Sequence, residues 1–531
     1  MDTKTSERAA KAAGMISLLY LLSRILGFVR ESLSGQLFNR FQTDAYIAAF
    51  TIPDAMYYLL VGGALSAAFI PIFTEYLAKG KEQEGWEVAS TFMNITVLLL
   101  ACFTLLGVIF AEGVAPLEAP NFAIVPAKMQ LLVELTRIMF PAVCFTAMAG
   151  MVGGALNSYQ HFLAPALGPV FYNIAIIGAA VLLGPKWGIK GMAIGVVFGA
   201  FGNFLIQAFF LSRFSGRKYR FGYIDLKNPG FRRMILLMIP ALIGLSATQV
   251  NIWITNVMAS YLPEGSITAI RFANRLIQLP IGIFAAGIAT AFFPMLSGMA
   301  AKEEMDSFKD SLSLALRSIF FLMIPSAVGL ILLRKPIVAL LFQGHHFTVH
   351  DTELTSYALL FYSLAIFAHA AILMLPRAFY ALKDTKTPVI VSVSSVLLSI
   401  MLNYIFLRFT KLGVGGFALS FSMMGLVNML SLMAILRRKI GGIRGGRILR
   451  SFLKCLGASL AMGAALWYLN PVFLSLIQSL HLTGRMADGF IVAGAMAVGV
   501  AVFFGSAFLL KMEELHMALR MIKRRLHRKA A

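Results

Sequence analysis

Charge is scarce in this chain. Asp, Glu, Lys and Arg make up 13% of its 531 residues, whereas about a quarter is usual in a soluble protein. Hydrophobic residues make up 59%, and the mean hydropathy is +0.80. So few charges over so long a chain exclude an ordinary soluble globular protein and predict an integral membrane protein whose main solvent is lipid.

Cysteine and the common catalytic motifs are also nearly absent. Cys102, Cys144 and Cys455 all lie in apolar runs, which is typical of small core residues and not of disulfides or metal ligands. The chain has no phosphate-binding glycine loop, no Gly-x-Ser-x-Gly elbow and no Cys-x-x-Cys pair. We therefore expect no enzyme, no cofactor and no ATP hydrolysis.

Three histidines cluster beside an acid in a predicted outer loop. His345, His346, His350 and Asp351 do not have the spacing of a standard zinc motif on one helix face. The sequence therefore predicts a solvated loop and no metal site.

Long apolar runs are what the chain has in place of charge. Fourteen of them approach the ~20 residues that a spanning helix needs. They cover 14–36, 44–72, 88–112, 127–154, 164–184, 188–213, 233–260, 266–298, 309–333, 352–382, 387–408, 413–436, 450–470 and 487–511. The first, second and eighth carry charge or proline and are the weakest. The predicted fold class is an all-α integral membrane protein with about fourteen transmembrane helices.

Most of the net charge of +22 lies in connections between these runs. Cations gather in 213–233, in 437–450 and in the tail from Glu513 to Lys529, whereas outer loops such as 261–266 are short and poor in cations. Cytoplasmic loops collect Lys and Arg, so this asymmetry predicts a multi-pass protein of the cytoplasmic membrane with both termini inside. The tail resembles a basic amphipathic helix on the inner leaflet, and no nucleic-acid partner is expected.

The chain also contains an internal repeat. Gly188-Ile-Lys-Gly191-Met-Ala193 recurs 225 residues later from Gly413, and Ala68-Phe69-Ile-Pro71 recurs 223 residues later from Ala291. The offset spans six helices, an even number, so both copies share one topology and form parallel repeats. The predicted parts are an N-terminal lobe (1–213), a basic cytoplasmic linker (214–232), a C-terminal lobe (233–436), and two further helices with the tail (437–531).

The first span holds charges that lipid would not accept. Arg24 and Glu31 lie about 20° apart around the helix, and Arg30 lies about 120° away. An ionisable residue inside a span is a functional hypothesis by default. These two arginines are therefore candidate substrate contacts with Glu31 as an acidic partner. The alternatives are snorkelling to the interface and a local pair between Arg30 and Glu31.

The eighth span concentrates polar groups on one face. Arg271, Asn274, Arg275 and Gln278 fall within about 100°, and Pro280 predicts a bend just beyond them. Arginines turned toward an aqueous cavity favour an anionic ligand.

Acids in the second span offer a competing explanation. Asp44 and Asp54 are predicted acidic cavity residues, and either could pair with the arginines of the eighth span. Asp44 could instead be the N-cap of its own helix. Elsewhere, Glu134 and Arg137 are spaced to satisfy each other.

Several segments resemble one family of membrane transporters. The run Leu22–Glu31 resembles the first-helix signature of the MurJ (MviN) family of lipid II flippases, a branch of the multidrug/oligosaccharidyl-lipid/polysaccharide exporter superfamily. Segments 43–46, 68–72, 156–165, 273–276 and 386–388 match the family as well.

The resemblance implies two lobes around a central cavity that work by alternating access. It implies transport of lipid II, the undecaprenyl-pyrophosphate-linked disaccharide-pentapeptide of peptidoglycan synthesis, from the inner to the outer leaflet. Lipid II and membrane lipids are the implied partners, with room for other cell-wall synthesis proteins. The family's cavity arginines map onto Arg24, Arg30 and Arg275, and its acids map onto Glu31 and Asp44.

The sequence departs from the family pattern at three positions. A family arginine of the second helix falls at Tyr57, a nearby glutamate at Gly62, and the acid after the eighth-helix arginine at Gln278. These departures make Arg271 a candidate substitute. The alternative functions are another exporter of the same superfamily, moving a polyprenyl-linked oligosaccharide or a drug, and a cell-wall assembly scaffold without transport.

Overall fold

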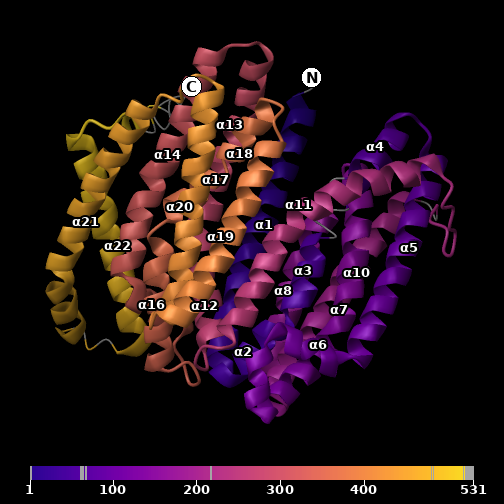
Figure 1. Cartoon of the computed structure of the whole chain (residues 1–531), viewed down its shortest axis with the longest axis horizontal. Coiled ribbons are helices and arrows are strands. Elements are labelled where there is room, and N and C mark those ends of the chain that lie inside the picture. The colour runs from indigo at the N-terminus through magenta and orange to yellow at the C-terminus, as the bar shows by residue number, and fades with distance from the viewer. Residues whose placement is uncertain are drawn as a thin grey trace. The chain divides into compact units, whose positions relative to one another are not determined.

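The computed structural model describes residues 3–59, 65, 68–215, 218–479, 481, 483–517 and 520, and every regular element in this part of the chain is helical (Figure 1). The predicted all-α class is confirmed. Ten helices within the described ranges are long and apolar enough to cross a membrane, or eleven if Val349–Ser363 and Ile366–Ala381, bent by 55°, form one span. The count of fourteen stays a prediction.

The chain folds as two compact units. The first comprises residues 1–268 and 344–347, and the second comprises 269–343 and 348–531. The first unit contains α1 (Thr3–Leu37), α2 (Arg40–Ala49), α3 (Thr51–Tyr57), α4 (Ile70–Ala78), α5 (Glu82–Ile109), α6 (Ala111–Glu118), the 3₁₀ turn η2 (Pro120–Ile124), α7 (Pro126–Ser158), α8 (Leu163–Leu182), α9 (Gly184–Trp187), α10 (Ile189–Ser215) and α11 (Pro229–Ala259). Helix α12 (Ser266–Pro280) begins in the first unit and continues in the second. The second unit then contains the π turn η3 (Ile281–Ala285), α13 (Ala286–Ala301), α14 (Met305–Leu332), α15 (Arg334–Phe342), α16 (Val349–Ser363), α17 (Ile366–Ile372), α18 (Leu375–Ala381), α19 (Lys386–Phe409), α20 (Val414–Lys439), α21 (Gly445–Ser479) and α22 (Gly484–Leu509).

The helix starts reproduce the predicted repeat. Three pairs begin 223 residues apart, namely α5 and α14, α7 and α16, and α8 and α19. Gly188 and Gly413, which are 225 apart, have φ of 57° and 53°, and each directly precedes a helix. Glycine adopts this left-handed conformation without a steric penalty, which explains its place at both turns. The lobe boundaries at 213 and 233 stay a prediction.

Small residues bring α8 and α10 into close contact. Gly191, Gly195 and Gly199 are spaced by four residues along α10. Gly195 and Gly199 face α8, and Gly191 faces Leu183 just after the end of α8. A Cβ atom at Gly195 would lie 2.5 Å from the Cβ of Ala179, and one at Gly199 would lie 2.9 Å from the carbonyl oxygen of Tyr172. Such spacing allows two backbones to approach where the hydrophobic effect does not drive helices together.

Two of the predicted spans are interrupted in the structure. The predicted second span is divided at Phe50, between α2 and α3. The predicted bend after Pro280 coincides with the π turn η3. A π turn releases backbone groups locally and is a usual cause of a change in helix direction.

The second unit ends in a polar cluster that holds the tail. Arg317 of α14 contacts the carboxylates of Glu513 (2.7 Å) and Glu514 (3.1 Å), and the Ser451 hydroxyl of α21 donates to Glu514. The predicted tail helix is described to Met517 and again at Arg520, and its remainder lies outside the described residues.

Candidate functional site

The arginines of α1 differ in their surroundings. Arg30 is 8% exposed, its guanidinium lies 3.2 Å from the Glu31 carboxylate, and it lies 5.9 Å from the centroid of the Phe50 ring. The local pair with Glu31, left open by the sequence, is thus present. Arg24 is exposed and, within the described part of the chain, has no hydrogen bond or ion pair. A guanidinium without such a partner, on a helix predicted to span the membrane, is a candidate donor to an anionic ligand.

Helix α12 is amphipathic, as its spacing predicted. Phe272 and Leu276 are buried on one face, whereas Arg275 and Gln278 are exposed and Arg271 is half-buried on the other.

Asn274, which shares the polar face predicted for the eighth span, is half-buried and lies close to Tyr362 of α16, as polar residues between helices commonly do. Its role as a polar cavity residue stays a prediction.

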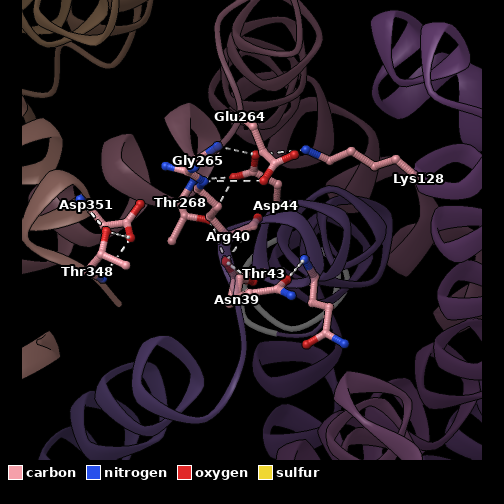
Figure 2. A network of polar contacts seen from close by, with 11 residues as sticks. Asn39, Arg40, Thr43, Asp44, Lys128, Glu264, Gly265, Thr268, Thr348 and Asp351 are labelled. Atoms are coloured by element: carbon pink, nitrogen blue, oxygen red, sulfur yellow. Dashed lines mark hydrogen bonds and ion pairs between the residues drawn. The ribbon is translucent and has the colours of Figure 1, made fainter. Parts of the chain in front are cut away.

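Asp44 is the centre of a buried polar network (Figure 2). Its Oδ2 accepts from Lys128 Nζ (3.1 Å) and from the Gly265 N–H (2.8 Å), and its Oδ1 accepts from the N–H (3.0 Å) and the hydroxyl (2.7 Å) of Thr268. The Thr268 hydroxyl also contacts that of Thr43 at 3.0 Å. Asp44 is 1% exposed and Lys128 5%.

Two interactions that the sequence left open for Asp44 are wrong, namely the N-cap of its own helix and a pair with the arginines of the eighth span. Its role as an acidic cavity residue stays a prediction. The N-cap of α2 is Asn39, whose side chain accepts from the Gln42 N–H. Asp44 instead caps the N-terminus of α12, where the free N–H groups and the positive end of the helix dipole favour a carboxylate. Its ion-pair partner is Lys128, and not Arg271 or Arg275.

Two tyrosines of the predicted second span, Tyr57 and Tyr58, are exposed. Their rings meet edge to face with centroids 5.6 Å apart. Asp54, which precedes them in α3, is half-buried. Gly62 lies outside the described residues.

The predicted pair of Glu134 and Arg137 is wrong. Glu134 pairs with Lys190, and Arg137 pairs with Glu112 at 2.9 Å. Local spacing allowed the pair, but each side chain meets a closer partner from a different helix.

Two buried charged residues were missed by sequence reasoning. The Lys128 ammonium lies 4.2 Å from the centroid of the Phe122 ring. Among the described residues, Asp44 is the only carboxylate that pairs with Lys128. A lysine near the start of a predicted span was the available signal. Glu118 is fully buried, and the Thr136 hydroxyl donates to Glu118 Oε2 at 3.2 Å. Glu118 Oε1 has no hydrogen-bond partner among the residues that the structure describes. Burial raises the pKa of Glu118 to about 8.

The histidine loop has an ordinary structural role. Asp351 forms a capping box with Thr348 at the start of α16, and His345 meets His346 edge to face at 6.0 Å. No group of three His, Cys, Asp or Glu side chains in the described ranges is placed to hold a metal ion.

The helical fold of this chain resembles that of a solved membrane transporter. A multidrug-resistance transporter of the MATE family, from the MOP superfamily and solved in an inward-facing conformation, has the same fold, with a TM-score of 0.67 at 15% identity over 80% of this chain and 95% of that one.

Closer similarity identifies the family. The family model described as lipid II flippase MurJ matches residues 33–484. A probable lipid II flippase MurJ of Vibrio cholerae is 33% identical over 440 residues, covering 81% of this chain and 83% of that protein. A solved lipid II flippase MurJ in an inward closed conformation has a TM-score of 0.77 at 26% identity, covering 93% of this chain and 98% of that one. The chain belongs to the MurJ family of lipid II flippases.

Proposed function

We propose that this protein flips lipid II from the inner to the outer leaflet of the bacterial cytoplasmic membrane for peptidoglycan synthesis. The observation that carries the proposal is membership of the MurJ family over 33–484, supported by a fold match over 93% of the chain. In this proposal, the lobes 1–213 and 233–436 move the substrate by alternating access. Transport requires no covalent step.

Arginines are proposed to bind the pyrophosphate of the substrate. The planar guanidinium group binds phosphate oxygens in a bidentate manner, which a lysine ammonium does not do. Exposed Arg24 and Arg275 are the leading contacts, half-buried Arg271 supplements them, and Arg30 acts from its pair with Glu31.

The proposed orientation has both termini in the cytoplasm. The basic segments 213–233 and 437–450 support it, because cations are retained on the cytoplasmic side. With this orientation, a membrane potential that is negative inside drives an anionic head group outward by about 2.3 kcal/mol per charge per 100 mV.

Replacement of Arg24 tests the proposal. This protein is depleted in its host cell and replaced by variants. Lipid II in the outer leaflet is then quantified by cleavage with an externally added enzyme. We expect Arg24→Ala and Arg24→Lys both to lower the initial rate by roughly tenfold or more, because a lost bidentate contact to phosphate removes ~1.5–3 kcal/mol. Arg137→Ala, which breaks an exposed pair with Glu112, is the matched control and should retain the rate.

Each outcome of this experiment is informative. Normal outward appearance of lipid II after complete depletion, with no second flippase present, would refute the function. A scaffold would tolerate both Arg24 variants at normal expression. Full activity of Arg24→Lys alone would show that charge suffices and would refute bidentate recognition. An unchanged rate after the membrane potential is collapsed would refute the electrical driving force.

A further inference from the structure

The connection between α10 and α11 is hydrogen-bonded to side chains of α5. The Asn94 amide of α5 donates to the carbonyl oxygens of Arg220 and Tyr223, each at 2.9 Å, and the Ser90 hydroxyl accepts from the Arg220 N–H at 3.1 Å. Ser90 is fully buried beneath the connection. Hydrogen bonds to the backbone hold the connection at one height on α5.

That height is close to the edge of the hydrocarbon layer. Helix α5 has 28 residues, which at 1.5 Å each is about 42 Å, and a hydrocarbon core is about 30 Å thick. Counting ~20 residues back from Ile109, at the far end of the span, reaches Ser90. The connection is bonded to Ser90 and Asn94, and so lies where acyl chains meet head groups.

The connection presents apolar side chains outward at this height. Phe221 is 92% exposed at a turn that Gly222 makes with φ of 72°, and Ile224 and Leu226 are also exposed. A phenylalanine held in this way in water would be unfavourable, because its whole ring would be hydrated. The backbone on both sides of this ring is hydrogen-bonded to α5, through Arg220 and Tyr223.

Cations surround these apolar side chains. Lys218, Arg220, Lys227 and Arg232 flank the turn, against one acid, Asp225. Lys218 and Arg220 share exposed ion pairs with acids of α5, whereas Lys227 and Arg232 take part in no ion pair within the described ranges. Cations beside an exposed ring complement a surface that is anionic at its head groups and apolar just below.

We propose that residues 218–227, with Arg232, form an anchor in the inner leaflet. Phe221 inserts among the upper acyl chains, and Lys227 and Arg232 bind anionic phospholipid head groups. The proposal rests on the proposed cytoplasmic position of this connection. It gives the first unit a lipid-dependent attachment just before the start of α11.

A fluorescent probe at Phe221 tests the anchor in the full-length protein. Phe221→Cys is made in a background in which Cys102, Cys144 and Cys455 are replaced by alanine, and is labelled with an environment-sensitive dye. The protein is placed in nanodiscs of phosphatidylglycerol with phosphatidylcholine, or of phosphatidylcholine alone. The matched control is Ile124→Cys, which is 75% exposed and lies in a stretch of sequence, 101–127, that contains no Lys or Arg. Quenching by lipids spin-labelled near the head group is compared with quenching by aqueous iodide.

The anchor predicts that lipid quenching at position 221 is strong and iodide quenching weak in anionic nanodiscs. Lys227→Gln with Arg232→Gln should lower the ratio of inserted to exposed probe by roughly tenfold in anionic nanodiscs and leave it unchanged in neutral ones. The probe at position 124 should not respond to lipid charge.

Three results would overturn the proposal. Strong iodide quenching in both nanodiscs would place the turn in water. Protection from both quenchers would show that a protein surface covers it. Insertion that is independent of lipid charge would remove the role of the cations. Because no readout involves lipid II, failure here leaves the flippase proposal standing, and one-sided labelling of sealed vesicles tests the orientation separately.

Discussion

The buried pair of Asp44 and Lys128 offers a quantitative test of the structure. Asp44→Asn keeps the side-chain shape and removes the charge that faces Lys128, which is 5% exposed. A buried charge that loses its partner costs about 3–5 kcal/mol of unfolding free energy. Lys128→Met should cost less, about 1.5–3 kcal/mol, because Asp44 keeps its three donors from Gly265 and Thr268.

The double variant separates this explanation from simple loss of contacts. Once Lys128 is methionine, Asp44→Asn no longer leaves a cation unpaired. The double variant should therefore lose no more unfolding free energy than Asp44→Asn alone. Its loss should be smaller than the sum of the two single losses by about 2 kcal/mol.

The assay is reversible unfolding of the purified protein by increasing SDS in mixed micelles, followed by tryptophan fluorescence. The control is Arg40→Gln, which breaks the neighbouring exposed pair with Glu264 and should cost under about 1 kcal/mol. If Asp44→Asn cost no more than Arg40→Gln, or if the single losses were additive, the argument from a buried and coupled pair would be wrong.

Two further predictions concern the same unfolding assay. The folded protein holds the proton of Glu118 up to about pH 8, whereas the unfolded chain releases it near the ordinary pKa of 4.5, so stability should fall as pH rises between these values. Relative to wild type, the unfolding free energy of Glu118→Gln should therefore rise by about 1.4 kcal/mol per pH unit across this window. A difference between the two proteins that does not depend on pH would contradict the burial of Glu118. In a second prediction, Gly195→Ala should lower the unfolding free energy by about 1–3 kcal/mol, because the new Cβ would lie 2.5 Å from that of Ala179. Gly178→Ala on the facing helix meets no atom within 4 Å and should be neutral, so equal losses would refute the close packing of α8 on α10.

Spans and repeat were predictable because their signals are local or periodic. An apolar run of helical length shows directly in the sequence. The repeat was visible because the matching glycines Gly188 and Gly413 must both adopt a positive φ, which restricts the residue type at each turn. Arg24, Arg275 and their neighbours stood out because charge inside an apolar run requires an explanation.

Partners were not predictable in this way. Asp44 is 84 residues from Lys128 and 224 from Thr268, and nothing in its own helix indicates either contact. Glu134 had an acceptable local partner in Arg137, but packing places Lys190 closer. The choice among partners depends on which helices are neighbours, and that depends on the packing of the whole unit.

The sequence by itself determined that this is a polytopic membrane protein with a duplicated helical plan and arginines within its spans. These properties follow from hydropathy, period and residue type, which are all read along the chain. Only the tertiary structure decided that Asp44 caps a helix from across the unit and that Arg30 is paired. It also decided that, among the described residues, Arg24 and one oxygen of the buried Glu118 have no partner. The physical reason is that the energy of a charge depends on its desolvation and its nearest opposite charge, and folding sets both.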